Sequence, residues 1–299
     1  MKSREILSVT KDTIAEWQED GAARLAAAMA YYTTFSLAPL LIVVLAIAGL
    51  LGGRDATQGL ILNQVEDLVG IQGREFVVSM IENASSSTDV GVAASILGSL
   101  TLFIAALGAF NALQYSLNRI WDVETKPIEG WGKRVLDFIF KRLLSFSMLL
   151  AIGFLLIVSL VVSAGLSALS EFLGSIPVLS TLVLQILNLL VSFGLITLLF
   201  ALMFKFIPDI EISWNNVWLG AAITAAFFLI GKFLIGLYLG RSDIGNTFGA
   251  AGSMALIMIW VYYSSQILFL GAEFTQVYAK RTGKQPDPDQ HAVKGKRKR

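Results

Sequence analysis

The sequence predicts an all-α, polytopic membrane protein with six transmembrane helices, N and C termini in the cytoplasm, an amphipathic N-terminal helix and an outer helical hairpin. Hydrophobic residues make up 55% of the 299-residue chain. Charged residues make up only 15%, against roughly 25% in soluble domains. The apolar residues also gather in runs long enough to cross a bilayer as helices. These two observations exclude an ordinary soluble enzyme.

The first 25 residues predict a cytoplasmic amphipathic segment. Ile6, Leu7, Ile14 and Trp17 lie among charged residues, a pattern typical of a helix on the membrane surface. No short apolar core with a small-residue cleavage site precedes the first long apolar run. We therefore expect no cleaved signal peptide.

Six apolar runs predict the transmembrane helices of a domain that covers residues 26–279. Each run has about 20 mostly apolar residues, enough at 1.5 Å per residue to cross a hydrocarbon core of roughly 30 Å. The runs lie at 26–51, 90–117, 143–169, 178–204, 214–239 and 250–272.

The loop at 52–89 predicts a helical hairpin on the outer face of the membrane. Apolar residues recur at helical spacing between Leu60 and Val69 and again between Phe76 and Ile81. The glycines at 70 and 73 separate the two stretches. Each stretch is too short to span a bilayer, so we expect an interfacial or cap-like hairpin.

The basic residues predict the orientation of the spans. Assigning alternate loops to opposite sides puts 19 Lys and Arg residues on the side of the N-terminus and 3 on the other side. The positive-inside rule then places both termini in the cytoplasm. A five- or seven-span topology would put one basic terminus outside, so six spans are favoured.

The C-terminal segment, residues 280–299, predicts a disordered basic cytoplasmic tail. It contains two prolines and ends in the sequence KGKRKR. Clustered lysines and arginines beside a membrane attract anionic lipid headgroups, and they also enforce topology. No aromatic residue accompanies these charges to stack on a base, so we expect no nucleic-acid partner. A homo-oligomer is left open.

Several kinds of chemistry are excluded by residues that the chain lacks. It has no cysteine, its one histidine is His291 in the tail, and it has no GxxxxGK[ST] loop for a nucleotide. We therefore expect no catalytic residue, no metal site and no cofactor. The Asp-x-Glu pairs that begin at Asp122 and Asp209 are too unspecific to predict a nuclease.

Polar residues inside the predicted spans mark candidate substrate-path positions, because such groups are costly in lipid. One helical face toward the cytoplasmic end of the second span carries Asn111, Gln114, Asn118 and Asp122 at helical spacing. With residues of the first and sixth spans, they predict a cytoplasm-facing polar pocket. Its expected lining is Tyr31, Tyr32, Asn111, Gln114, Asn118, Tyr262, Gln266 and Glu273.

A second set of candidates lies in the outer half of the predicted membrane. Gln185 and Asn188 share a face of the fourth span, and Lys232 lies in the fifth. A lysine that faces these amides could bind an anionic group. The alternative for each polar residue is structural: Asn and Gln often only join helices by hydrogen bonds, and Glu273 could be a solvated helix end or the partner of Arg119.

Several segments resemble the YihY/BrkB family of bacterial inner-membrane proteins. They are AAAMAYYTTFSLAPLL, ALQYSLNRIWDVETKP, KRLLSFSMLLAIGFLL, FIPDIEISWNNVWLGA, GKFLIGLYLGRS and GAAGSMALIMIWVYYSSQILFLGAEFTQVYA. The resemblance runs from about residue 21 to residue 280 and implies a six-helix, multi-pass inner-membrane protein. Relatives carry labels as a tRNA-processing ribonuclease or a virulence factor, and some are proposed to move lipids.

The sequence is compatible with three functions. A transporter or translocase of lipids or other envelope components fits best, because the chain offers spanning helices, polar positions at depth and a cation for an anionic headgroup. The alternative is a membrane scaffold for envelope assembly that transports nothing. Ribonuclease activity is the least favoured.

Overall fold

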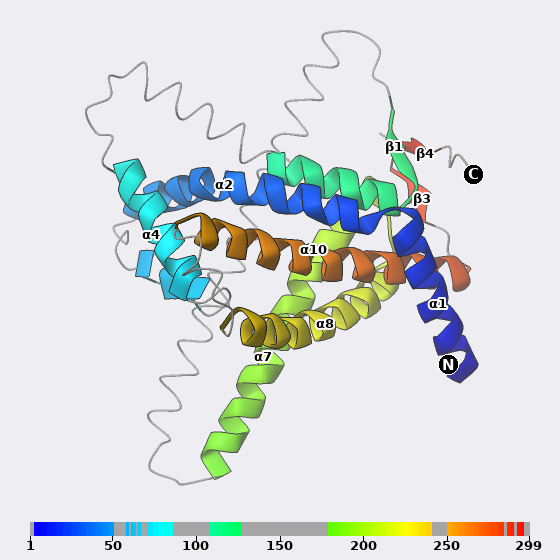
Figure 1. Ribbon diagram of the computed structural model, residues 1–299. Helices are drawn as coiled ribbons and strands as arrows, with labels where there is room; N and C mark the ends of the chain where they lie inside the picture. The colour runs from blue at the N-terminus through cyan, green and yellow to red at the C-terminus, as the bar shows by residue number, and fades with distance from the viewer. Residues whose placement is uncertain are drawn as a thin grey trace. The chain divides into compact units, whose positions relative to one another are not determined.

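The computed structural model of the chain describes residues 3–50, 58–59, 61–63, 65–66, 71–85, 108–126, 179–240, 250–283, 286–289 and 292–295. These residues are mainly helical (Figure 1). The helices are α1 (Ser3–Glu19), α2 (Ala22–Leu50), α4 (Ile71–Ser85), α7 (Leu179–Phe206), α8 (Trp214–Gly240) and α10 (Ala250–Arg281). Residues 108–120 form a further helix. The strands are β1 (Val123–Thr125), β2 (Ile210–Glu211), β3 (Asp287–Pro288) and β4 (Ala292–Lys294).

Three described helices are long and apolar enough to cross a membrane. The segments are Leu189–Phe206 of α7, Trp214–Ile235 of α8 and Met254–Arg281 of α10. They overlap the last three predicted spans, and the segment of α10 extends nine residues beyond the predicted end at residue 272. Helix α2 covers the first predicted span, and the helix at 108–120 contains the described end of the second. The predicted span at 143–169 lies outside the described residues, so the count of six stays a prediction.

Large apolar side chains on α7 and α8 are exposed. Extended apolar surface is uncommon on soluble monomers, but a helix that faces lipid presents it because acyl chains replace water as the solvent. The exposed apolar surfaces of α7 and α8 therefore suit contact with the acyl chains of a bilayer. The exposed residues are Ile186, Leu187, Leu189, Leu190, Phe227, Ile230, Phe233 and Leu234.

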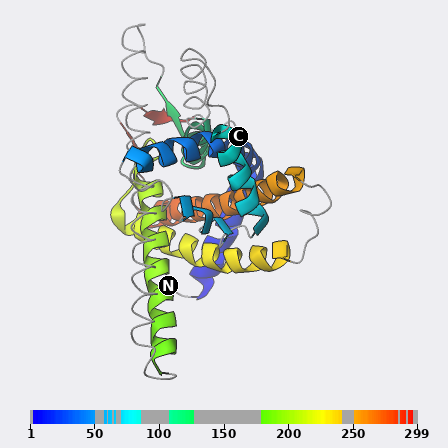
Figure 2. The ribbon, with the colours of Figure 1, turned by 90° about the vertical axis from the view of Figure 1, so that its left-hand side faces the viewer.

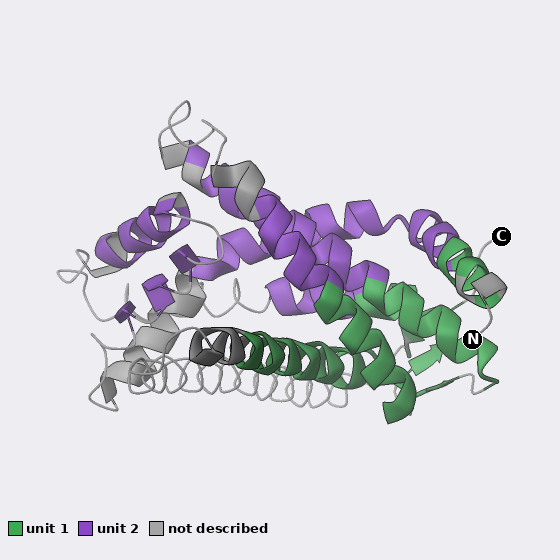
Figure 3. Ribbon diagram, turned by 90° about the horizontal axis from the view of Figure 1, so that it is seen from below, with its two compact units in different colours: residues 1–12, 117–226, 271–299 green, residues 13–116, 227–270 purple. Residues whose placement is uncertain are grey.

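The chain forms two compact units, drawn in green and purple in Figure 3. Unit 1 contains residues 1–12, 117–226 and 271–299. Unit 2 contains residues 13–116 and 227–270. Each unit is described by itself below, with the packing contacts and hydrogen bonds that hold it together.

In unit 1 the C-terminal segment is part of the folded structure. Strand β4 pairs antiparallel with β1, with Val123 opposite Lys294, and β3 pairs antiparallel with β2, with Ile210 opposite Pro288. The expectation of a disordered tail is therefore wrong for residues 286–289 and 292–295. Composition favoured disorder, but the partners that order these residues lie far away in the sequence, at 123–125 and 210–211.

Two Gly–Thr contacts bring α8 and α10 together in unit 1. A Cβ atom added to Gly220 would lie 1.8 Å from Thr275 Oγ1, and one added to Gly271 would lie 1.8 Å from Thr224 Oγ1. Each threonine hydroxyl donates to the carbonyl oxygen four residues earlier in its own helix, at 2.7 Å in both cases. The hydroxyls are thus satisfied, and the glycines leave the space that lets the two backbones approach.

The same two helices also pack on each other in unit 2. The Cβ position of Gly231 is 2.7 Å from Tyr263 Cε1 and from Ile267 Cδ1. Ile235 and Leu256 form a buried cluster further along the pair. Figures 1 and 2 show the yellow and orange helices side by side in perpendicular views.

The predicted outer hairpin has a small core of its own in unit 2. Leu62, Val77 and Ile81 are buried together, and Leu37 of α2 packs against them. Arg74 Nη1 also donates to Glu66 Oε2 at 2.6 Å. Helix α4 begins at Ile71, so residues 71–73 of the predicted break at 70–73 are helical.

The N-terminal segment forms the expected helix, α1, and this helix has an exposed apolar side chain. Leu7 is 73% exposed, which suits contact with a membrane surface. Gly21 has a left-handed backbone (φ +65°) and lies between the end of α1 at Glu19 and the start of α2 at Ala22. In unit 1, Arg281 of α10 donates to Ser8 Oγ at 2.6 Å and pairs with Asp12.

Gly220→Ala should destabilise the protein by about 1–3 kcal/mol, because the added methyl group overlaps Thr275 and forces α8 and α10 apart. The measurement is thermal unfolding of the purified protein in detergent. Adding Thr275→Ala, which removes the Oγ1 atom nearest to the new methyl group and also Cγ2, should restore part of the loss.

Gly194→Ala on α7 is the matched control. Apart from its neighbours on α7 itself, no atom of the described residues lies within 4 Å of the Cβ position of Gly194, and alanine is the better helix former. An equal effect of the two Gly→Ala changes would show that Gly220 is not a close-contact position.

Candidate functional site

A reciprocal hydrogen-bonded pair joins two distant parts of unit 1. Asn118 Nδ2 donates to Asp209 Oδ2 at 2.8 Å, and the Asp209 backbone N–H donates to Asn118 Oδ1 at 2.8 Å. Asn118 is only 8% exposed. The carbonyl of Asp209 accepts from the N–H of Asp289 at 3.1 Å, next to the β2–β3 pair. Asn118 therefore supports the connection between α7 and α8.

Asp122 ends the helix at 108–120 in a left-handed conformation with φ of 53°. Aspartate tolerates this region better than most residues. Its carbonyl accepts from the N–H of Gly295 at 2.7 Å, which attaches the end of β4 to this turn. The sequence spacing placed Asp122 on the same helical face as Asn118. That interpretation is wrong, because the helix ends at residue 120.

The Asp122 carboxylate meets two side chains of α10. Asp122 Oδ2 accepts from Gln276 Nε2 at 3.3 Å and lies 3.5 Å from Lys280 Nζ. Gln276 Nε2 also donates to the carbonyl of Ile120. The turn after residue 120 is therefore held by β4 through its backbone and by α10 through its side chains.

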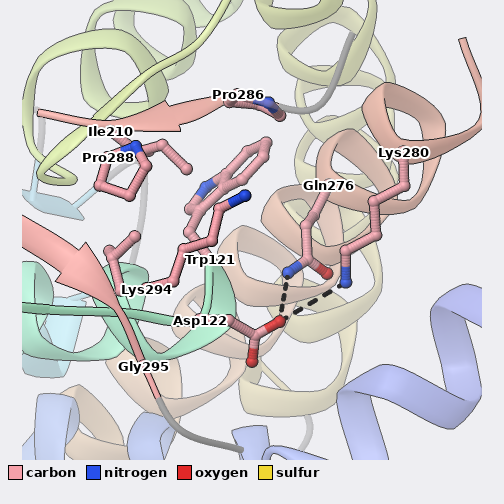
Figure 4. A pocket seen from close by; sticks show the side chains of 10 residues that line it. Trp121, Asp122, Ile210, Gln276, Lys280, Pro286, Pro288, Lys294 and Gly295 are labelled. Carbon is pink, nitrogen blue, oxygen red and sulfur yellow. Dashed lines mark hydrogen bonds and ion pairs between the residues drawn. The ribbon is translucent and has the colours of Figure 1, made fainter. Parts of the chain in front are cut away.

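These groups surround a pocket of about 220 Å³ in unit 1 (Figure 4). In this view the indole of Trp121 lies between Pro288 and Gln276, and dashed lines join Asp122 to Gln276 and Lys280. The C-terminal segment forms much of the wall. The lining residues are Trp121, Asp122, Val123, Ile210, Gln276, Lys280, Pro286, Pro288, Lys294 and Gly295.

Two buried polar atoms of this lining have no hydrogen-bond partner among the described residues. They are Nε1 of Trp121 and Oε1 of Gln276. Trp121 is 4% exposed and Gln276 is 2% exposed. Buried polar groups are normally paired, so each unpaired one calls for an explanation. A ligand that offers both an acceptor and a donor would satisfy the two atoms.

Exposed aromatic residues surround the connection between α7 and α8. Phe206, Trp214 and Trp218 are each exposed, and their rings contact one another in sequence. Lys205 Nζ lies 5.9 Å from the centre of the Trp214 ring and donates to the carbonyl of Ile212 at 2.6 Å. Tryptophan and lysine at the end of an apolar helix are typical of the membrane–water interface.

The predicted inner-pocket residues fall in both units. Unit 2 holds Tyr31, Tyr32, Asn111, Gln114, Tyr262 and Gln266, whereas unit 1 holds Asn118 and Glu273. Their roles as substrate-path residues stay predictions. None of them lines the pocket described above.

The predicted residues of unit 2 differ in their burial. Tyr31 and Tyr32 are 52% and 46% exposed, and their rings meet edge to face at 5.5 Å. Asn111 is exposed and Gln114 is half-buried, although the spacing puts them on one helical face. Gln266 is half-buried, and its Oε1 atom has no partner among the described residues.

Glu273 is completely buried on α10. This contradicts its interpretation as a solvated helix end. Thr275, two residues later on α10, lies against Gly220 of α8.

Lys232 is half-buried on α8, inside the candidate span Trp214–Ile235. Its neighbours Phe233 and Leu234 are exposed, whereas Gly231 and Ile235 are buried. Lys232 thus lies between the packed face of α8 and the face available to lipid. Gln185 and Asn188, its predicted partners, lie on α7, but their side chains are outside the described part of the structure.

Sequence reasoning missed Trp121, Gln276, Lys280 and Lys294. One signal was available: Gln276 follows Glu273 by one helical turn and extends the polar face predicted on the sixth span. The contribution of Lys294 depends on strand pairing over more than 160 residues. No local pattern predicts such pairing. Within the described ranges, no three acidic or histidine side chains converge as metal ligands would.

The apolar helices, their exposed apolar faces and the interfacial aromatic cluster define the class of this protein as an integral membrane protein. The chain belongs to the family described as Virulence factor BrkB, which matches residues 13–296. The resemblance to the YihY/BrkB family is thereby confirmed.

Relatives across nearly the whole chain carry the name UPF0761 membrane protein. The one from Albidiferax ferrireducens is 27% identical over 273 residues, which are 88% of this chain and 60% of the relative. The one from Tolumonas auensis is 28% identical over 263 residues, which are 84% of this chain and 78% of the relative. The chain thus spans less than two thirds of the Albidiferax protein. No solved structure gives a significant match.

The Asn118–Asp209 pair should show strong coupling in a double-mutant cycle. We expect Asn118→Ala and Asp209→Ala each to destabilise the protein, and the double variant to lose about 0.5–3 kcal/mol less than the sum of the single losses. Thermal unfolding in detergent measures this coupling. Asp209→Asn is the matched variant, because it keeps an acceptor for Asn118 and should lose less than Asp209→Ala. Strict additivity would contradict the role of this pair as a joint.

Proposed function

We propose that this protein is a multi-pass transporter or translocase of the bacterial inner membrane that moves lipids or other envelope components. The topology proposed for it has six spans and both termini in the cytoplasm. The observation that carries the proposal is Lys232, a half-buried lysine within an apolar membrane-spanning segment. An ionisable residue at such a position is costly and is a functional-site candidate by default.

The position of Lys232 along α8 supports this role. It follows Trp214 by 18 residues, which is about 27 Å along a helix. Trp214 belongs to the interfacial aromatic cluster, so Lys232 lies toward the opposite side of the hydrocarbon core. There its ammonium group, at the edge of the lipid-accessible face, suits the anionic headgroup of a lipid that enters from the bilayer.

The proposal includes no catalytic step. Two of the acidic side chains that a nuclease would need have structural partners: Asp209 accepts from Asn118, and Asp122 accepts from Gln276 and faces Lys280. Glu124 and Glu211 lie in the paired strands β1 and β2. These partners support a membrane role over ribonuclease activity. If the wild-type protein degraded RNA and a variant lacking all four acids did not, an enzymatic function would replace this one.

Lys232→Met should slow the movement of an anionic lipid across vesicle membranes by about tenfold or more. The lost contact is a charged hydrogen bond, which contributes about 1.5–3 kcal/mol. The measurement uses the full chain in liposomes and follows fluorescent phosphatidylglycerol and phosphatidylcholine by chemical quenching of the outer leaflet.

Lys232→Arg is the matched control, because it keeps the positive charge and should retain most of the activity. Methionine fills similar space without a charge, so thermal unfolding of Lys232→Met should match that of the wild type. Undiminished transport by Lys232→Met would refute the role of this residue. A wild-type protein that moves neither lipid would favour the scaffold instead.

A further inference from the structure

Two polar atoms that line the pocket of unit 1 have no hydrogen-bond partner among the described residues, as expected of a site that binds a ligand. Nε1 of Trp121 is a donor, and Oε1 of Gln276 is an acceptor. Both side chains are more than nine-tenths buried and line the same 220 Å³ pocket. This volume holds several water molecules, or a small polar group and part of the molecule that carries it.

The charges of the lining favour an anion. Asp122 and Lys280 face each other at 3.5 Å, and the Asp122 carboxylate also accepts from Gln276. The negative charge of Asp122 is therefore already balanced by Lys280. Lys294, on β4, has no ionic partner among the described residues. The lining thus carries one more positive than negative charge, together with the indole donor of Trp121.

The requirement for a donor on the ligand narrows its chemistry. An anion that has only acceptors would satisfy Trp121 and the lysines but would leave Gln276 Oε1 unpaired. A phosphate ester that carries a hydroxyl group supplies both functions. Its phosphate oxygens accept from Trp121, Lys280 and Lys294, and its hydroxyl group donates to Gln276.

The position of the pocket in unit 1 indicates where such a ligand comes from. Ile210, which lines the pocket, lies in the connection between α7 and α8. This connection is flanked by the exposed rings of Phe206 and Trp214. Aromatic residues of this kind lie at the level of lipid headgroups, where hydroxylated phosphate esters are abundant.

We infer that this pocket binds the phosphate ester of a hydroxylated headgroup, of the glycerol phosphate type, with Trp121 and Gln276 as hydrogen-bond partners and Lys294 as the matching charge. The general attraction of a basic tail for anionic membranes thereby becomes a defined site. Binding here does not depend on lipid transport and would equally serve a scaffold.

The test is calorimetric titration of the full-length protein in an uncharged detergent with dioctanoyl phosphatidylglycerol. Dioctanoyl phosphatidylcholine is the comparison lipid, because it has no headgroup hydroxyl and no net charge. We expect phosphatidylglycerol to bind at least tenfold more tightly. Trp121→Phe should weaken its binding about tenfold, since one hydrogen bond to a charged group is lost.

Two matched controls separate the pocket from the surface. Trp218→Phe changes an exposed indole outside the pocket and should leave the affinity unchanged. Lys294→Gln should weaken binding severalfold, most at low salt, whereas Lys11→Gln, an exposed lysine of α1, should not. Lys294 is on the surface, so this variant keeps the test valid even if Trp121→Phe folds poorly.

A competition experiment with a soluble phosphate ester shows whether the ligand is a lipid or a free phosphate ester. If glycerol 3-phosphate competes with the lipid at similar concentrations, the site recognises the phosphate ester alone; if it does not compete, the site recognises the lipid. Either result, with weakening in Trp121→Phe or Lys294→Gln, supports the site. Binding of phosphatidylglycerol that is no tighter than that of phosphatidylcholine, or that both pocket variants leave unchanged, overturns the inference.

Discussion

The reciprocal pair of hydrogen bonds between Asn118 and Asp209 is the contact on which the polar end of unit 1 depends. An asparagine amide can donate and accept at once, and here it does both with one residue. The pair connects the helix at 108–120 to the start of β2. On one side, β3 pairs with β2; on the other, the turn at Asp122 receives Gln276 and Gly295. The pair thereby links the segments that carry the two strand pairs.

A second constraint comes from the apolar solvent of membrane helices. Lipid does not drive apolar helices together, so close packing and satisfied polar groups must do so. The contacts of Gly220 with Thr275 and of Gly271 with Thr224 meet this need. Each hydroxyl bonds to its own helix, and its methyl-bearing side chain fills the space above a glycine on the other. The pair α8–α10 can therefore approach closely without an unpaired hydroxyl.

These two constraints commit some polar side chains to structural roles, and the function must be sought among the others. Asn118, one of the predicted pocket residues, is occupied by a structural role. Lys232 lies at the edge of an apolar span, where only a lipid or another polar group can match its charge. Trp121 and Gln276 lie beside the C-terminal segment, so the basic tail contributes to a site in addition to any attraction it has for the membrane. Recognition of anionic lipid is our proposal for each location.

The sequence by itself determined the class, the helical stretches and the family, because long apolar runs and helical spacing are local signals. It predicted α2, α7 and α8 to within about four residues and the start of α10, which continues nine residues beyond the predicted end at residue 272. It also predicted the apolar stretches that supply the core of the expected hairpin. It also singled out Asn118, Glu273 and Lys232 as unusual. The partner of Asn118, the complete burial of Glu273 and the order of residues 286–289 and 292–295 were decided only by tertiary structure. Strand pairs between residues 123 and 294 or 210 and 288 depend on the arrangement of helices between them, and a short polar segment has no local preference that reveals such a partner.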